Sequence, residues 1–224
     1  MKKILFSILI ASLFTVNPVQ AQLTKAQQKE RSEQVKQQRK ELDKKVSKDA
    51  RNEAKRLKKE GWKVTPGSLS LEKQVDRSML MQYELDESGY PLYVIGQAMS
   101  IGESYDAAKM QALELARQDA ASKLHIEITA LVETSIANEQ LPENEAASIV
   151  KTVSASKSLI SQSLGRVITV VEAYRELDNK NKEVLVRVAY NYKMAMESAK
   201  KAIRQELEKN GTDLHNELDS KLGW

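Results

Sequence analysis

The chain has 224 residues and a formal net charge of +4, with 29% charged residues, 5% aromatic residues and no cysteine. The absence of cysteine excludes disulfides, thiolate metal sites and cysteine nucleophiles, and it also excludes a lipid attached to a cysteine at the start of a processed chain. A chain of this length suits one or two small domains.

The first 21 residues have the pattern of a secretory signal peptide. Lys2 and Lys3 precede an apolar stretch over residues 4–16. Val19 and Ala21 then fit a signal peptidase site, with cleavage after Ala21. The apolar stretch is shorter than the roughly 20 residues that span a bilayer, and a short anchor that stays attached is the alternative. We therefore expect a periplasmic or envelope-associated protein with no transmembrane segment in the mature chain.

Residues 22–63 form a basic segment with 15 Lys or Arg and 7 Asp or Glu, whereas residues 64–224 hold 18 and 24. Residues 23–60 contain neither Gly nor Pro and carry a thin apolar stripe, which predicts one long polar helix that ends at Gly61. The stripe consists of Val35, Leu42, Val46, Ala50, Ala54 and Leu57. We expect residues 22–60 to meet an envelope protein or an anionic envelope surface; a solvated helix is the alternative. Export makes a nucleic-acid partner unexpected.

An α+β domain is predicted over residues 64–210. A turn at Pro66-Gly67-Ser68 leads to a helix over residues 71–84 that Ser70 can cap. A strand is expected from Tyr90 to Ile101, followed by a long helix with Ser104 as its N-cap. The inner seam of that helix is rich in alanine: Ala108, Ala112, Leu115, Ala116, Ala120 and Leu124. Residues 126–136 fit either a helix or a strand.

In the second half of this domain the sequence predicts a helix, a hairpin and a closing helix. The helix covers residues 146–164 and ends at Gly165. Two strands within residues 166–192, joined by a turn over 178–182, predict an antiparallel hairpin with one buried face. Its inward residues include Val184, Val186, Val188, Tyr190 and Tyr192, and the closing helix turns Met196, Ala199, Ile203 and Leu207 inward. A C-terminal tail follows over residues 211–224.

These elements define an α+β fold class. We predict a small antiparallel sheet of about three strands, packed by two or more helices and preceded by the long polar helix.

Residues with catalytic chemistry are sparse. The two histidines, His125 and His215, have no ligand spacing around them, and no glycine-rich phosphate loop occurs. Ser154 and Lys157 fit the S-x-x-K pattern of serine acyl-transfer enzymes, but the companion motifs are missing. We expect no catalytic residue, no metal ligand and no cofactor, and therefore no enzyme.

Tyrosines gather on the predicted sheet. Tyr93, Tyr174, Tyr190 and Tyr192 are the candidate binding surface, because exposed tyrosines are common in binding sites. Burial of the same side chains in the core or on the sheet surface is the alternative.

Four segments carry a resemblance to a known family. They are the Tyr-Val-Ile-Gly-Gln-Ala strand at 93–98, the alanine-rich helix at 107–120, the Ser-to-Gly element at 161–165 and the strand at 183–188. With them the chain resembles the Lpp-twenty lipoprotein family, whose fold is shared by the N-terminal domain of the flagellar accessory protein FlgT. The resemblance implies two helices against a small antiparallel sheet and a non-enzymatic envelope role in assembly or interaction. The lipidated cysteine of the family is missing here, and the basic helix is additional.

Taken together, the sequence predicts an exported, non-enzymatic cell-envelope protein that acts as an interaction or scaffolding module. The alternative is a periplasmic protein that binds a small ligand between sheet and helix, near Tyr93 and Tyr190.

Overall fold

The computed structural model describes residues 45–139, 143–165 and 167–209, together with positions 29, 32, 33 and 36. The predicted signal peptide, most of the basic segment before residue 45, His215 and the predicted tail lie outside the described residues. The chain divides into Met1–Lys44 and a second unit, Lys45–Trp224. The description below concerns the second unit.

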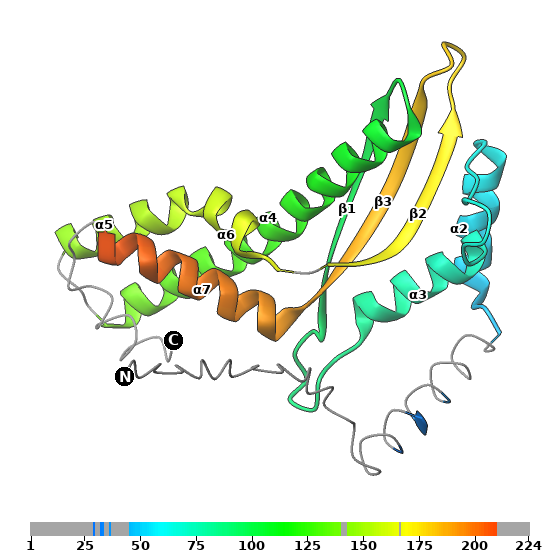
Figure 1. The fold of residues 1–224 in the computed structure, drawn as a ribbon. Coiled ribbons are helices and arrows are strands. Elements are labelled where there is room, and N and C mark those ends of the chain that lie inside the picture. Colours follow the sequence, from blue (N-terminus) through cyan, green and yellow to red (C-terminus); the bar gives the residue numbers. More distant parts are fainter. Residues whose placement is uncertain are drawn as a thin grey trace, which may run out of the picture. The chain divides into compact units, whose positions relative to one another are not determined.

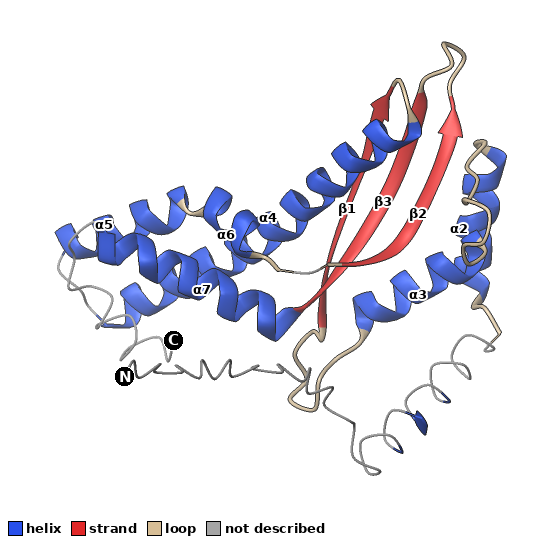
Figure 2. Ribbon diagram, viewed as in Figure 1, coloured by secondary structure: helices blue, strands red, loops and turns tan. Residues whose placement is uncertain are grey.

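A three-stranded antiparallel sheet forms the centre of this unit (Figures 1 and 2). Its strands are β1 (Tyr93–Gly102), β2 (Ile168–Glu176) and β3 (Lys182–Asn191), in the order β1-β3-β2. β2 and β3 form the predicted hairpin, whose turn places Lys180 at a φ of 66°. The predicted α+β class is thus confirmed, with β1 beginning at Tyr93 rather than Tyr90.

The long helix α4 (Tyr105–Glu139) covers one face of the sheet (Figure 1). Ser104 caps it, since its hydroxyl accepts a hydrogen bond from the Ala107 N–H at 3.2 Å. The predicted seam is buried through its four alanines and Leu124, but Leu115 was wrongly placed there and is 39% exposed. The ambiguous residues 126–136 continue the helix, because Ile128 and Val132 keep its inward spacing and are buried.

Three further helices complete this side of the molecule: α5 (Glu143–Ala155), α6 (Lys157–Ser163) and α7 (Tyr192–Lys209). The single helix predicted over residues 146–164 is wrong, because it breaks at Ser156. The Val153 carbonyl accepts hydrogen bonds from both the N–H and the hydroxyl of Ser156, at 3.0 and 2.6 Å. Serine here competes with the helical pattern. Tyr192 begins α7 instead of extending β3, and the Asn191 side chain caps that helix.

The opposite face of the sheet is covered as well, by α2 (Lys48–Lys59) and α3 (Leu71–Tyr83) (Figure 1). The prediction of a hairpin with one buried face is therefore wrong. Leu185 and Val171 are buried in a second cluster with residues of both helices. This cluster comprises Ala50, Ala54, Leu57, Trp62, Leu71, Val75, Val171, Ala173 and Leu185.

One continuous helix over residues 23–60 is also wrong, because residues 45–47 are not helical and α2 begins only at Lys48. Ser47 is extended and caps α2, with its hydroxyl accepting from the Ala50 N–H at 3.2 Å. Its own N–H donates to Asp76 on α3 at 3.0 Å. Residues 45–47 thus do not continue the helix, and Asp76 of α3 holds Ser47 in place.

Polar contacts fasten α2 and its C-terminal end to the rest of the unit. Gly61, at a φ of 89°, ends the helix as predicted, and the Trp62 N–H bonds back to the Leu57 carbonyl at 3.0 Å. Arg187 of β3 pairs with Glu53 of α2 at 2.5 Å, and both side chains are 17% exposed. Residues 45–63 therefore pack in the same unit as the sheet.

Candidate functional site

The four tyrosines of the predicted binding surface lie in three different places. Tyr190 is only 4% exposed and belongs to the main core. Tyr174 is half-buried and meets the ring of Tyr105 edge-on, with ring centres 5.4 Å apart. Tyr93 and Tyr192 line one groove together. Only that pair remains available as a shared surface.

The groove that Tyr93 and Tyr192 share runs along the outer edge of β1. It has a volume of about 600 Å³, and its wall includes Gln82, Pro91, Tyr93, Lys123, Glu127 and Tyr192. These residues come from α3, the connection into β1, α4 and the start of α7. Segments far apart in the sequence thus meet at one edge of the sheet.

Charged side chains of α4 close the backbone edge of β1 within this groove. Asp119 accepts a hydrogen bond from the Gln97 N–H at 2.9 Å. Lys123 donates to the Ile95 carbonyl at 2.6 Å and pairs with Asp119 at 2.9 Å. Edge strands offer unpaired N–H and C=O groups to other strands, so this ion pair protects the middle of β1 from pairing.

The phenol of Tyr192 is tied to a carboxylate on α4. Burial, together with a hydrogen bond to Glu127 and the charge of that side chain, raises the pKa of Tyr192 to about 12. The phenol therefore stays protonated at neutral pH and acts as a donor. This contact fixes the start of α7 beside α4.

Next to the groove, exposed apolar side chains surround the connection between α3 and β1. We call Leu80, Tyr83, Leu85 and Tyr90 the connection patch; their exposed fractions are 58, 76, 59 and 63%. The groove residues Gln82 and Pro91 lie within the same segment. Sequence reasoning assigned Leu80 and Tyr83 to the helix over residues 71–84 and Tyr90 to the following strand, and it named none of the four as a binding surface, although the apolar Leu85 and Tyr90 on either side of the turn were a visible signal.

The backbone under the connection patch is well ordered by hydrogen bonds. The Asp86 carboxylate accepts from the N–H groups of Ser88 and Tyr90, both at 2.9 Å. The Asp86 N–H donates to the Tyr90 carbonyl at 2.7 Å, and Gly89 supplies a φ of 81°. The patch is thus carried on the end of α3 and on a hydrogen-bonded turn rather than on a loose loop.

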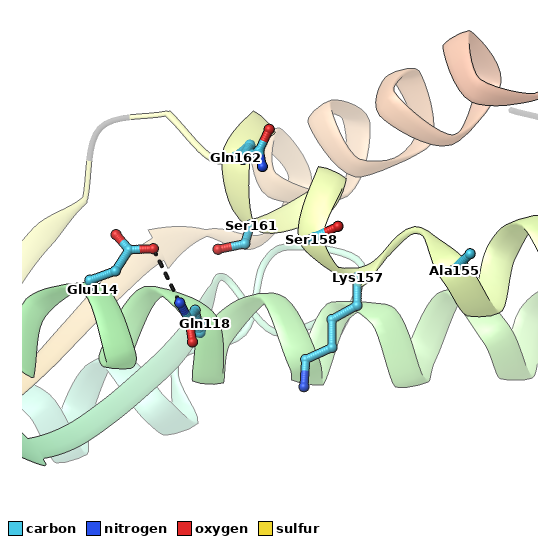
Figure 3. Close-up of a pocket in the computed structure, with 7 residues that line it drawn as sticks. All are labelled: Glu114, Gln118, Ala155, Lys157, Ser158, Ser161 and Gln162. Atoms are coloured by element: carbon cyan, nitrogen blue, oxygen red, sulfur yellow. Dashed lines mark hydrogen bonds between the residues drawn. The ribbon is translucent and has the colours of Figure 1, made fainter. Parts of the chain in front are cut away.

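A second groove lies between α4 and the helices α5 and α6 (Figure 3). Its volume is about 450 Å³, and polar side chains dominate it, among them Glu114, Gln118, Lys157, Ser158 and Ser161. Lys157 extends toward α4 in Figure 3, while Ser154 of the S-x-x-K pattern is exposed and lies outside the lining. The pattern therefore does not bring a serine and a lysine into one pocket.

A third groove, also of about 600 Å³, separates the start of α7 from the segment leading into β2. Tyr190, Val167, Ile168 and Met194 line it. Tyr190 and Tyr93 consequently face different grooves, so the two residues named for a small-ligand pocket do not share one. The Tyr190 hydroxyl is itself buried and has no hydrogen-bond partner among the described residues.

Within the described residues, no group of three or more His, Asp or Glu side chains is arranged to hold a metal ion. His125 contacts the Val153 carbonyl through Nε2 at 2.8 Å. That contact joins α4 to α5 at the position where the helical pattern breaks. We assign this histidine a structural role.

Comparison with known protein families, curated proteins and solved structures found no match to this chain. The resemblance to the Lpp-twenty family therefore stays a prediction. None of the described helices combines the length and the apolar composition needed to cross a membrane.

Proposed function

We infer that the chain is an exported envelope protein that works as an interaction module and docks a partner protein on the connection patch. The observation that carries this proposal is the patch itself: four large apolar side chains are exposed, Leu80 and Tyr83 on the end of α3 and Leu85 and Tyr90 on either side of a hydrogen-bonded turn. Exposed apolar patches with aromatic residues are typical of protein interfaces. A surface that is already ordered also loses less conformational entropy when it binds.

The adjoining groove supports the same assignment. Tyr93 and Tyr192 place two half-buried rings beside the patch, and Asp119, Lys123 and Glu127 form a charged rim. An apolar centre with a polar rim is the usual composition of a protein–protein contact. The signal-peptide pattern supports the compartment, because it predicts that the partner lies in the periplasm or the envelope.

The basic segment supports a second contact, with an anionic envelope surface. In α2 the side chains of Ala50, Ala54 and Leu57 face inward, so the opposite side of the helix points to solvent. That side carries Lys48, Arg51, Lys55, Arg56 and Lys59, all exposed. A row of cations of this kind is attracted to anionic headgroups and is screened by salt.

Site-specific photo-crosslinking in cells tests the proposed docking surface. A photo-reactive residue at Tyr90 is expected to yield a discrete adduct in the envelope fraction. The matched control is Met110, which is 74% exposed on α4 and lies outside the connection patch. Adducts of equal size and yield at both positions, or none at either, would contradict the proposal. Recovery of the chain in the cytoplasmic fraction, without loss of its first 21 residues, would contradict export.

A further inference from the structure

β1 is an edge strand whose backbone is only partly closed. In an antiparallel sheet, alternate residues turn their N–H and C=O groups toward the same side. Ile95 and Gln97 turn these groups away from β3, because Lys123 and Asp119 bind them. By the same alternation, Met99 and Ile101 also turn theirs outward. No hydrogen bond to these outward groups is formed by any described residue.

The opposite edge of the sheet, formed by β2, has its outward backbone groups hydrogen-bonded over its central part. On β2, Tyr174 exchanges two backbone hydrogen bonds of 2.8 Å with Lys63. The Glu172 N–H donates to the Gln74 side-chain oxygen at 2.8 Å. The outward backbone groups of Met99 and Ile101 are thus open, whereas those of Ile95 and Gln97 on β1 and of Glu172 and Tyr174 on β2 are hydrogen-bonded.

Apolar side chains accompany this open backbone. Met99 is 56% exposed and Ile101 is 50% exposed. Both lie on the sheet face that α2 and α3 cover over Val171 and Leu185, but these two helices leave Met99 and Ile101 themselves exposed. Natural edge strands usually carry a charge, a proline or a bulge at such a position. Here the strand has none.

We propose that this open stretch of β1 pairs with the same stretch of a second copy, in antiparallel register with Ser100 opposite Ser100. In this register Met99 of each copy faces Ile101 of the other on the same side of the sheet. The outward backbone groups of Met99 and Ile101 then bond to each other across the two-fold axis. Two three-stranded sheets join into one sheet of six strands, as two-fold symmetry requires.

Charge complementarity favours a second copy as the occupant. Glu103 is exposed just beyond the end of β1, and in this register it approaches Gln97 of the other copy. The Gln97 side-chain oxygen accepts a hydrogen bond from Arg187 Nε at 3.0 Å, while Nη2 of the same guanidinium pairs with Glu53. The guanidinium beside the incoming carboxylate would thus be shared between two acidic side chains. The two-fold axis repeats this acid-to-base approach at both ends of the contact. A shift of two residues would place either Met99 opposite Met99 and Ile101 opposite Gln97, or Ile101 opposite Ile101 and Met99 opposite Glu103. Only one apolar pair would then remain instead of two.

The closed part of the edge limits the contact. Asp119 and Lys123 occupy the backbone at Gln97 and Ile95, so pairing stops there. A short contact of this kind gives a dimer that depends on concentration rather than an obligate one. The residues involved differ from those of the connection patch, so this inference is independent of the proposed function.

Sedimentation of the chain, purified as cells produce it, tests the association. We expect a monomer–dimer equilibrium with substantial dimer at about 100 μM. Ile101→Lys should shift the equilibrium to monomer by at least about tenfold in Kd, since a lysine on an open edge blocks pairing. Met110→Lys, on α4, should leave it unchanged. A wild-type chain that stays monomeric, or equal behaviour of both variants, would overturn the proposal.

Disulfide trapping tests the register. Because the chain has no cysteine, Met99→Cys and Ile101→Cys each introduce a single thiol. Mixed and oxidised together, the two variants should cross-link several times faster than either variant alone, because facing residues bring their Cβ atoms within disulfide range. Equal rates in the mixture and in the separate samples would overturn this pairing. Cross-linking of either thiol to a different protein, without the mixed dimer, would show that another strand occupies the edge.

Discussion

At the scale of single residues, Gly96 decides how closely α4 can approach the sheet. A Cβ atom at this position would lie 2.1 Å from the Ala116 carbonyl oxygen and 2.8 Å from the Ala120 nitrogen. Both are backbone atoms of a packed helix, which cannot move aside at low cost. We therefore expect Gly96→Ala to lower the free energy of unfolding by about 3 kcal/mol.

Urea denaturation followed by circular dichroism measures this loss. Gly165→Ala is the matched control, because a Cβ there meets nothing within 4 Å. It should change the free energy of unfolding by less than about 0.5 kcal/mol. A Gly96→Ala chain as stable as this control would show that α4 does not approach β1 so closely.

Single residues were also where the sequence was most informative. The alanine spacing predicted the face that α4 buries, and Ser70, Ser104 and Gly61 were recognised as helix ends. Leu115 was misplaced because its apolar character outweighed its position one step from the seam. The four candidate tyrosines differ in burial, and the sequence could not separate them. A strand residue such as Tyr190 shows the same alternation whether its ring is packed in a core or open to solvent.

At the scale of elements, the second helical layer on the sheet was the main feature that the sequence did not reveal. The residues of β3 that alternate with its valines are Leu185, Arg187 and Ala189, and the arginine among them suggested a face open to solvent. Arg187 is neutralised by Glu53, from a segment more than a hundred positions earlier, at 2.5 Å. The residue pattern within one strand does not show that a carboxylate distant in the sequence will pair with an arginine of that strand and so allow the arginine to be buried.

The contact between α2 and α3 should depend on pH. Lys58 pairs with Glu72 at 2.5 Å, and this hydrogen bond lowers the pKa of Glu72 below its ordinary value of 4.5. A carboxyl with a depressed folded pKa contributes its full stability above the ordinary value and loses it as the pH falls through the folded value. Because the Lys58 side chain is 52% exposed, we expect a contribution below about 1 kcal/mol.

Unfolding free energies measured between neutral pH and acid conditions test this dependence. Glu72→Gln should flatten the part of the curve below pH 4.5 while lowering stability slightly at neutral pH. Glu87→Gln, in the exposed turn before β1, is the control and should leave the curve as it is. Identical acid limbs for the wild type and Glu72→Gln would argue against the ion pair.

At the scale of the whole molecule, the limits of the sheet-bearing unit follow from long-range contacts that no local pattern contains. The sequence placed the start of the α+β domain at residue 64, where the charge balance changes. The structure packs residues 45–63 against Val171 and Leu185. Charge composition separates the segments at residue 64, whereas tertiary contacts place the division between Lys44 and Lys45.

Two truncations distinguish a folded unit that starts at residue 45 from one that starts at residue 64. A chain that begins at residue 45 keeps every residue of the second cluster, so we expect its thermal midpoint to lie within about 2 °C of that of residues 22–224. A chain without residues 22–63 lacks Ala50, Ala54, Leu57 and Trp62, which uncovers Leu71, Val75, Val171 and Leu185. Losing even one buried Leu or Trp side chain costs about 2–5 kcal/mol, against a total stability of about 5–15 kcal/mol.

The shorter chain should therefore melt far earlier or fail to melt cooperatively, and it should bind a fluorescent probe of exposed apolar surface. Leu57→Ala in residues 22–224 separates loss of packing from loss of length. It should lower the midpoint in the same direction by a smaller amount, because it leaves the other contacts of α2 in place. If removing residues 22–63 were as harmless as removing residues 22–44, α2 and Trp62 would not hold the second face of the sheet.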